Sequence, residues 1–255
     1  MEVDHLVPGP LGAAEAIAMS DALLRSGDNR VPTVIWWEVV ETALIVGRTA
    51  APSIVDEGAC DRIGVPVVRR HTGGGPLLWD DGLLAVDVIL PKADPRAPID
   101  VVEAYRWLGD AAAAALRDVG VPAQRLEPAA ARANTSDADD AIAKLCFGGL
   151  SPHEIVVGDR KIAGLCQARR SRGSLLQLGV LVDVDCTGLA GLVHRGGLTV
   201  AEFARDLDDR VTTVGDHAFG VSATDVRSAL KRRIHGALQT EAVAKGSEGS
   251  VRQGP

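Results

Sequence analysis

VPVVRRHTGGGPLLWDDGLLAVDVILP, residues 65–91, decides the fold, because it joins two apolar runs through a glycine loop. Both runs are rich in Val, Leu and Ile and are bounded by Gly or Pro, which is typical of β-strands. Three successive glycines in the loop remove every Cβ, so backbone N–H groups can approach a ligand closely. The loop residues are Arg69, Arg70, His71, Thr72, Gly73, Gly74 and Gly75.

The side chains before the glycines indicate what such a loop could bind. Arg69 and Arg70 supply fixed positive charge and forked donors for a carboxylate, a phosphate or an acyl carbonyl. Thr72 adds a hydroxyl beside the same space. The alternative is a tight turn flanked by solvated arginines. The loop is neither a P-loop nor a dinucleotide loop, because it lacks a following GK[ST] and the GxGxxG spacing.

Periodic apolar patterns extend outward from this stretch. Helical spacing predicts helices over 12–26 and 55–63. Two strand-like runs within 32–46, VIWWEV and ALIVG, predict a hairpin-like pair. The clearest helix covers 100–119, with Asp100 as its expected N-cap.

The second half of the chain continues with strands and then helices. EIVVGDRKIAG, residues 154–164, predicts a hairpin with a Gly-Asp turn, and 175–185 predicts another strand. Helices are expected over 199–207 and 223–244, and a mobile loop over 127–141. Because strands and helices do not alternate as regular βαβ units, the sequence predicts an α+β fold with a mixed, mostly antiparallel sheet flanked by helices.

Length and composition limit the classes of protein. The 255 residues suit one large domain over 12–240, with an N-terminal lead, 1–11, and a flexible tail, 241–255. A net charge of −7 argues against nucleic acid as the main partner. No apolar run approaches the roughly 20 residues that span a bilayer, so no membrane partner is expected.

The N-terminus and the cysteines indicate a cytoplasmic location. MEVDHLVPGP has no basic region followed by an apolar stretch, so we expect no secretory signal. The cysteines form no CxxC pair, and in a cytoplasmic chain they are interpreted as free thiols. They are Cys60, Cys146, Cys166 and Cys186.

Two motifs together resemble a known family. ALIVGR…VPVVRRHTGGGPLLWDDGLLAVDVILP, residues 43–91, and GDRKIAG, residues 158–164, are similar to the lipoate/biotin protein ligase catalytic domains. The resemblance covers most of 12–190 and implies a class II synthetase-like fold whose arginine–glycine loop walls an acyl tunnel. It implies no metal site. The substrate-binding residues that it implies are Arg69, Arg70, Thr72, Gly73, Gly74, Gly75, Gly164 and Gln167.

The family carries a lysine in its GRKIAG-like element, and Lys161 matches that position. The resemblance implies that its ammonium holds the carbonyl oxygen of an acyl thioester or acyl-adenylate as negative charge develops. Alternatively, a partly desolvated Lys161 moves a proton. Without the resemblance, a surface hairpin lysine would be the simplest interpretation.

Cys146 is the expected nucleophile. Its context, CFGGLSPHEIVV, resembles the octanoyltransferases and octanoyl-transferring amidotransferases of the family, in which a cysteine takes the acyl group as a thioester. The alternative for Cys146 is a small buried hydrophobe. Cys166 is the rival nucleophile, whereas Cys60 and Cys186 are interpreted as structural.

Three features depart from the family pattern or add to it. Trp79 and Asp80 stand where many members have His-Asp, and Leu178 replaces a histidine that is common before the following glycine. A basic cluster, Arg169, Arg170 and Arg172, suggests a docking patch for an acidic lipoyl domain or a phosphate contact. The alternative for that cluster is a solvated turn.

We therefore expect an acyltransferase that moves an octanoyl or lipoyl group to, or between, acceptor lysines of lipoyl-domain proteins. Its partners would be lipoyl-domain or glycine-cleavage carrier proteins, or acyl carrier protein, and it would need no cofactor. One alternative is an ATP-dependent lipoate–protein ligase that forms lipoyl-AMP with ATP and magnesium. Another is a non-catalytic acyl-binding homologue, which the two missing histidines suggest.

Overall fold

A mixed, mostly antiparallel sheet system forms the centre of the molecule. The computed structural model describes residues 2–26, 30–133 and 140–248, with side chains as far as residue 240. One sheet has the strand order β1-β2-β6-β10-β9-β8-β7 and a smaller one β4-β3-β5. Their bounds are β1 (Asp4–Leu6), β2 (Thr33–Trp36), β3 (Ala43–Val46), β4 (Val67–Arg69), β5 (Leu77–Trp79), β6 (Leu83–Pro91), β7 (Gln124–Arg125), β8 (Ile155–Val157), β9 (Arg160–Arg170) and β10 (Gly173–Leu181).

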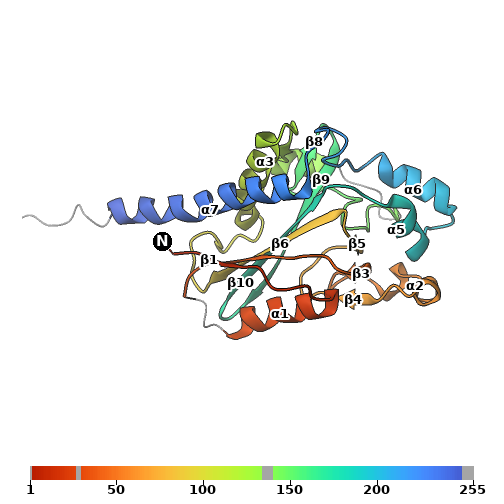
Figure 1. The fold of residues 1–255 in the computed structure, drawn as a ribbon, viewed down its shortest axis with the longest axis horizontal. Coiled ribbons are helices and arrows are strands. Elements are labelled where there is room, and N and C mark those ends of the chain that lie inside the picture. The colour runs from red at the N-terminus through yellow and green to blue at the C-terminus, as the bar shows by residue number, and fades with distance from the viewer. Residues whose placement is uncertain (1, 27–29, 134–139, 249–255) are drawn as a thin grey trace, which may run out of the picture.

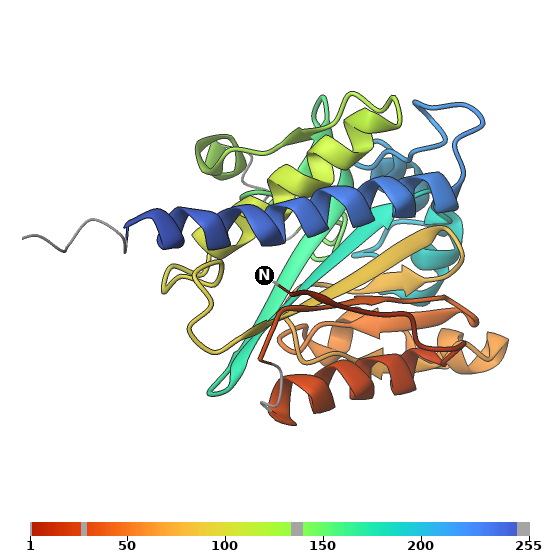
Figure 2. The same cartoon turned by 60° about the vertical axis from the view of Figure 1, so that its left-hand side comes forward.

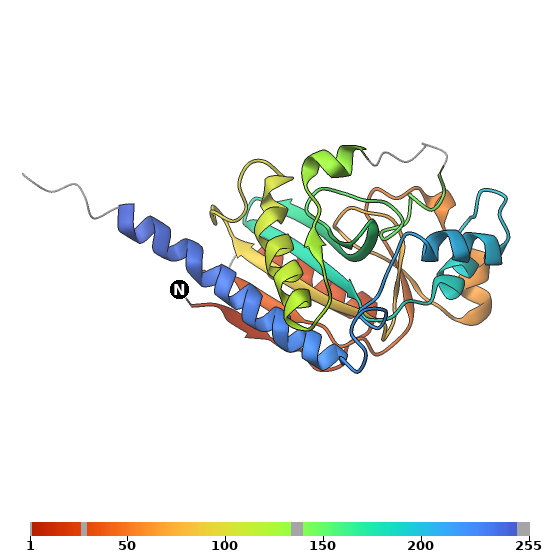
Figure 3. The same cartoon turned by 90° about the horizontal axis from the view of Figure 1, so that it is seen from above.

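Helices cover both faces of the large sheet. In Figures 1 and 2, α7 and α3 lie over one face and α1 lies under the other. Seen from above, α3 runs beside α7 (Figure 3). The helices are α1 (Ala13–Ser26), α2 (Glu57–Ile63), α3 (Arg106–Asp118), α4 (Pro128–Ala133), α5 (Cys186–Leu192), α6 (Val200–Asp208) and α7 (Ala223–Glu248).

The strand β6 shows how the sheet separates two cores. Its even-numbered side chains, Leu84 to Leu90, pack with α3 and α7. The odd-numbered Leu83, Ala85 and Ile89 face the core that contains α1 and the small sheet. This alternation follows from the period of two in a strand. Asp87 lies at an odd position and is therefore on the same face as α1.

The parallel pairs of described strands are β1 with β2 and β3 with β4, and the other pairs are antiparallel. The predicted α+β class and mostly antiparallel sheet are thus confirmed. The hairpin expected within 32–46 is wrong. Both edges of β2 are occupied, by β1 and β6, so β3 pairs with β4 and β5 in the small sheet.

Several helix limits differ from the predicted ones. Asp100 accepts hydrogen bonds from the backbone N–H groups of Val102 and Glu103, at 2.8 and 3.2 Å, but the element that follows is a 3₁₀ turn, Glu103–Tyr105, whose N-cap is Val102. The α-helix proper begins at Arg106.

The expected loop and tail are partly helical. In the 127–141 segment, α4 occupies Pro128–Ala133, and residues 134–139 lie outside the described residues. In the tail, α7 continues to Glu248, and 249–255 lie outside the described residues. Over the described chain, no helix is both long and apolar enough to cross a membrane.

Candidate active site

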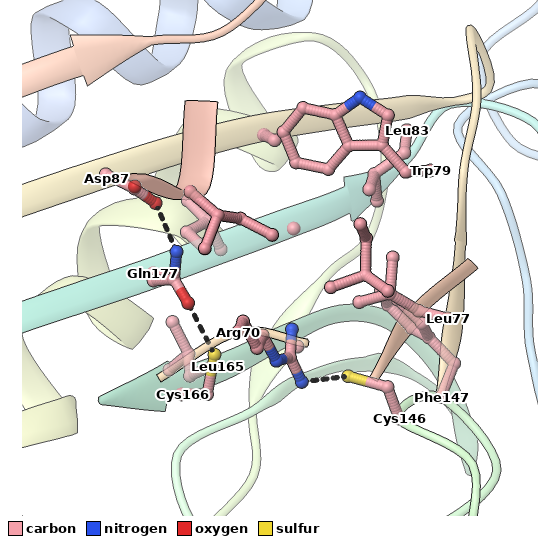
Figure 4. A pocket seen from close by; sticks show the side chains of 16 residues that line it. Arg70, Leu77, Trp79, Leu83, Asp87, Cys146, Phe147, Leu165, Cys166 and Gln177 are labelled. Carbon is pink, nitrogen blue, oxygen red and sulfur yellow. Dashed lines mark hydrogen bonds between the residues drawn. The ribbon is translucent and has the colours of Figure 1, made fainter. Parts of the chain in front are cut away.

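Two adjoining cavities meet at the glycine loop. The first, which we call the acyl cavity, has about 490 Å³ of empty space, part of it open to solvent, and is lined by residues of both the small and the large sheet. The second, the polar cleft, is larger, with about 1440 Å³ of empty space that includes open solvent, and it borders the three glycines. Both are lined by Arg70, Cys146, Leu165 and Cys166. Figure 4 shows the apolar wall of the acyl cavity, formed by Leu77, Trp79, Leu83 and Phe147.

Cys146 lies where the two cavities join. Its backbone N–H donates to the carbonyl of Pro76 at 2.9 Å, which fixes the cysteine beside the end of the glycine loop. Its sulfur accepts a hydrogen bond from Nη2 of Arg70 at 3.6 Å (Figure 4). A thiol in this position can be reached from the cleft while an attached chain extends into the acyl cavity.

Arg70 is the cation that faces this sulfur. Its side chain is buried, and its Nε has no hydrogen-bond partner among the described residues. Burial opposes the charge, but the neighbouring Cys166 and Cys146 raise the pKa of Arg70 above its usual value, so it remains a cation. The unpaired Nε–H is a donor that a ligand oxygen could satisfy.

Close packing explains the glycines. A Cβ on Gly75 would lie 1.8 Å from the carbonyl oxygen of Lys144, and one on Gly47 would lie 1.8 Å from that of Gly74. Gly74 itself has φ +100°, a conformation that other residues rarely adopt. The sequence therefore predicted the loop correctly, and the structure shows in addition that close contact with the chain beside Cys146 requires Gly75.

A chain of hydrogen-bonded polar side chains borders the acyl cavity, which Gln177 and Asp87 line and Thr72 does not. The hydroxyl of Thr72 donates to Oε1 of Gln177 at 2.6 Å, and Nε2 of Gln177 donates to Asp87 at 2.9 Å. Ser20 also donates to Asp87. Burial raises the pKa of Asp87, against the opposing effect of the Ser20 and Gln177 hydrogen bonds. Sequence reasoning missed Asp87 and Gln177, although Asp87 is the one acid in LLAVDVILP.

The other cysteines are in different surroundings. The thiol of Cys166 lies near Thr72 at 3.4 Å and Gln177 at 3.5 Å. Burial raises the pKa of Cys166, which keeps it protonated and makes it a poorer nucleophile. Cys60 and Cys186 are buried, and burial with Asp208 raises the pKa of Cys186 to about 12.

The ammonium of Lys161 points at acceptors within the protein. It donates to the carbonyl oxygens of Cys146 and Gly149, at 2.6 and 3.2 Å, and to the carboxylate of Glu154 at 2.6 Å. The lysine is 1% exposed, which excludes a surface hairpin lysine. Its contacts are therefore with the main chain of Cys146, whereas the resemblance implied a contact with the acyl carbonyl.

The remaining predicted binding residues divide into two groups. Gly164 lines the acyl cavity, and Gln167 lines the polar cleft, where its Nε2 donates to the carbonyl of Val101 at 2.5 Å. Arg69, in contrast, is turned toward the segment after β3, where it donates to the carbonyls of Gly47 and Ala50.

The basic cluster also binds backbone carbonyls. Arg169 donates to those of Pro98 and Ile99, and Arg172 donates to that of Ser26. These contacts brace neighbouring segments and occupy donors that a docking patch would use.

The two positions that lack the family histidines both contribute to the acyl cavity. Trp79 and Leu178 are among its lining residues. Apolar side chains at these positions make the cavity better suited to a hydrocarbon chain than imidazoles would.

A family profile described as the lipoyl protein ligase A/B catalytic domain matches residues 12–235. With the fold and site above, this match shows that the chain belongs to that family. The resemblance seen in the sequence is thus confirmed.

Relatives known by name include two octanoyltransferases. The chain is 34% identical over 181 residues to octanoyltransferase LipM of Exiguobacterium sp. (strain ATCC BAA-1283 / AT1b), covering 68% of this chain and 63% of the relative. It is 30% identical over 182 residues to octanoyltransferase LipM of Bacillus subtilis (strain 168), covering 69% of this chain and 64% of that one. The chain thus spans a little less than two-thirds of the length of these relatives.

Solved structures share the fold. Lipoate-protein ligase A bound with ATP superposes with a TM-score of 0.72 at 25% identity, covering 93% of this chain and 86% of that one. Protein Ta0514 of T. acidophilum, solved with bound lipoic acid, gives 0.71 at 25% identity with the same coverage. The lipoate-ligase-like fold that the sequence predicted is confirmed.

Proposed function

We propose that this chain transfers an octanoyl or lipoyl group to, or between, acceptor lysines of lipoyl-domain proteins through an acyl thioester on Cys146. The observation that carries the proposal is the position of the Cys146 sulfur, at the junction of an apolar cavity and an open cleft and 3.6 Å from Arg70. The names of the octanoyltransferase relatives support the reaction class.

In the first step, the thiolate of Cys146 attacks the carbonyl carbon of an acyl thioester on a carrier protein. The new C–S bond forms as the bond to the carrier sulfur breaks, and the carrier leaves as a thiolate that takes a proton. For transfer between lysines, the bond that breaks is instead the C–N bond of the donor amide, and the donor lysine takes a proton and leaves as an amine. Arg70 stabilises negative charge on the attacking sulfur and on the carbonyl oxygen, for which its unpaired Nε–H is available. The acyl chain lies against the apolar wall of the acyl cavity.

In the second step, the neutral amine of an acceptor lysine enters through the polar cleft and attacks the same carbonyl carbon. The amide C–N bond forms, the C–S bond to Cys146 breaks, and the amine loses a proton. Lys161 is the other residue on which we expect turnover to depend. Because a thioester is already activated, neither step needs ATP or another cofactor. We place the reaction in the cytoplasm, where the four free thiols stay reduced.

A second candidate is an ATP-dependent lipoate–protein ligase, because the solved lipoate-protein ligase A binds ATP and has the same fold. ATP and magnesium would then enter the polar cleft beside the glycine loop. The described residues contain no group of three carboxylate, imidazole or thiolate side chains that could hold a metal ion. Magnesium would then be held mainly by the phosphates, together with one or two carboxylates at most.

One experiment separates the candidates. The purified chain is incubated with an octanoyl-carrier protein without ATP and examined by intact-mass spectrometry. We expect a mass gain of one octanoyl group that Cys146→Ala abolishes and Cys166→Ala retains. Modification of a lipoyl domain only when lipoate and ATP are supplied would establish the ligase instead. No reaction in either assay would indicate a non-catalytic acyl-binding protein.

A further inference from the structure

A buried lysine and glutamate hold the backbone around Cys146. An ammonium has three N–H bonds, and Lys161 has three acceptors within hydrogen-bonding distance. Two are the carbonyl oxygens of Cys146 and Gly149, and the third is Oε1 of Glu154. The ring of Phe147 also lies 5.3 Å from the ammonium. With this set complete, Lys161 has no N–H left for a substrate.

Glu154 links the same segment to β9. Its Oε2 accepts from the backbone N–H of Ser151 at 2.7 Å, and its Oε1 accepts from that of Leu165 at 3.4 Å as well as from Lys161. The side chains of the ion pair are 1% exposed for Lys161 and 5% for Glu154. Because both charges are buried, removing one leaves the other uncompensated.

The backbone before Glu154 is itself unusual. His153 has φ +69°, a conformation that residues other than glycine rarely adopt. It is held by its N–H, which donates to the carbonyl of Leu126, and by Arg125, whose Nη1 lies 2.6 Å from its Nδ1. Contacts from outside the site therefore maintain the bend that turns Glu154 inward.

We propose that Glu154 is a positioning residue that acts on Cys146 through Lys161. Glu154 holds the ammonium, the ammonium holds the carbonyls of Cys146 and Gly149, and the cysteine sulfur is thereby kept opposite Arg70. This inference rests on the proposed function. It explains the expected dependence of turnover on Lys161 by the position in which Lys161 holds the nucleophile, Cys146. It predicts that the two charges act as one unit.

The test compares Glu154→Gln, Lys161→Met and the double variant with the wild type. One measurement is the rate of thioester formation from an octanoyl-carrier protein, resolved into kcat and KM. The other is the rate at which iodoacetamide alkylates Cys146, located by peptide mapping, which needs no acyl donor. Asp118→Asn is the matched control, because it removes a carboxylate from the ion pair with Arg233 that joins α3 to α7, away from the site.

We expect Glu154→Gln to lower kcat about 10²-fold, because small displacements of a reacting group have effects of this size. KM should change less than about twofold, since the cavities are intact. Alkylation of Cys146 should slow in both single variants, and the double variant should be no slower than the slower of them. Glu154→Asp, which keeps the charge, should recover part of the rate.

The proposal would be overturned if Glu154→Gln had the same kcat and the same rate of Cys146 alkylation as the wild type. It would also be overturned if the fold-losses of the two single variants multiplied in the double variant. Should Glu154→Gln fail to fold, Gly164→Ala provides a second test, because its Cβ would lie 3.2 Å from Cε of Lys161. An unchanged rate of Cys146 alkylation in folded Gly164→Ala would then count against the positioning of Cys146 by Lys161 and Glu154. Failure of the proposed function would show separately, as a wild type that is alkylated normally but forms no thioester.

Discussion

Nη2 of Arg70 lies 3.6 Å from the sulfur of Cys146, although the two residues are 76 positions apart in the chain. The contact joins the arginine–glycine loop to the segment around Cys146, in which the family resemblance places the nucleophile. It also distinguishes the two adjacent arginines, because Arg69 is directed to the carbonyls of Gly47 and Ala50.

Arg70→Gln should lower the rate of thioester formation by about 10²-fold, the usual effect of losing one charge-stabilising donor. Without the cation, negative charge on the attacking Cys146 sulfur loses its stabilising partner, so alkylation of Cys146 by iodoacetamide should also slow. The measurement is the alkylation rate at one fixed pH, with the exposed Arg233→Gln as control. An alkylation rate equal to that of the wild type would show that Arg70 does not act on the sulfur.

Gly75→Ala should destabilise the protein by about 1–3 kcal/mol, the usual cost of overpacking, because the new Cβ would lie 1.8 Å from the carbonyl oxygen of Lys144. Gly73→Ala is the matched control, since a Cβ there meets nothing within 4 Å. Urea unfolding of the two variants checks the difference. Equal free energies of unfolding would contradict the packing explanation of the glycine loop.

If the proposed transfer occurs, Ala85→Leu should shift the preference of the protein toward shorter acyl chains. Ala85 lines the acyl cavity from β6, and the larger side chain would occupy space that the far part of an octanoyl chain needs. Competition between octanoyl and butanoyl donors, read by intact mass, should change by roughly tenfold in favour of butanoyl. The same substitution at exposed Ala201 in α6 should leave the ratio unaltered. An unaltered ratio of octanoyl to butanoyl transfer in Ala85→Leu would show that the bound acyl group does not lie against Ala85.

The stability of the protein should fall below neutral pH partly because of His153. Burial, with Arg125 next, lowers the pKa of His153 below its ordinary value of 6.5. The unfolded chain therefore takes up a proton before the folded one does, and stability present above pH 6.5 is lost as the pH falls toward the folded-state pKa.

His153→Asn removes this titration and still tolerates positive φ. The decrease in melting temperature between about pH 7.5 and about pH 5.5 should be smaller in the variant, across the range where histidine titrates. His5, whose pKa is also lowered by burial, contributes equally to both proteins, so the difference isolates His153. An equal decrease in both would show that His153 is not linked to folding.

Much of the architecture was predictable because it depends on neighbours in sequence. The strand over LLAVDVILP, the Gly-Asp turn before Arg160 and the glycine loop each reflect local sequence, and each lies where the sequence indicated. The hairpin expected within 32–46 was wrong for the opposite reason. Whether β3 joins β2 depends on which strands already occupy the edges of β2, and those strands come from distant segments.

The sequence by itself determined the fold class, the family and the loop that borders the acyl cavity, because these follow from local periodicity and from motifs. Only the tertiary structure decided which cation faces the Cys146 sulfur. Arg70 reaches it, while Lys161 is held by Glu154 and by the backbone of the cysteine segment. The direction of a long side chain depends on the acceptors that folding brings within about 3 Å, and residues far apart in the sequence supply them.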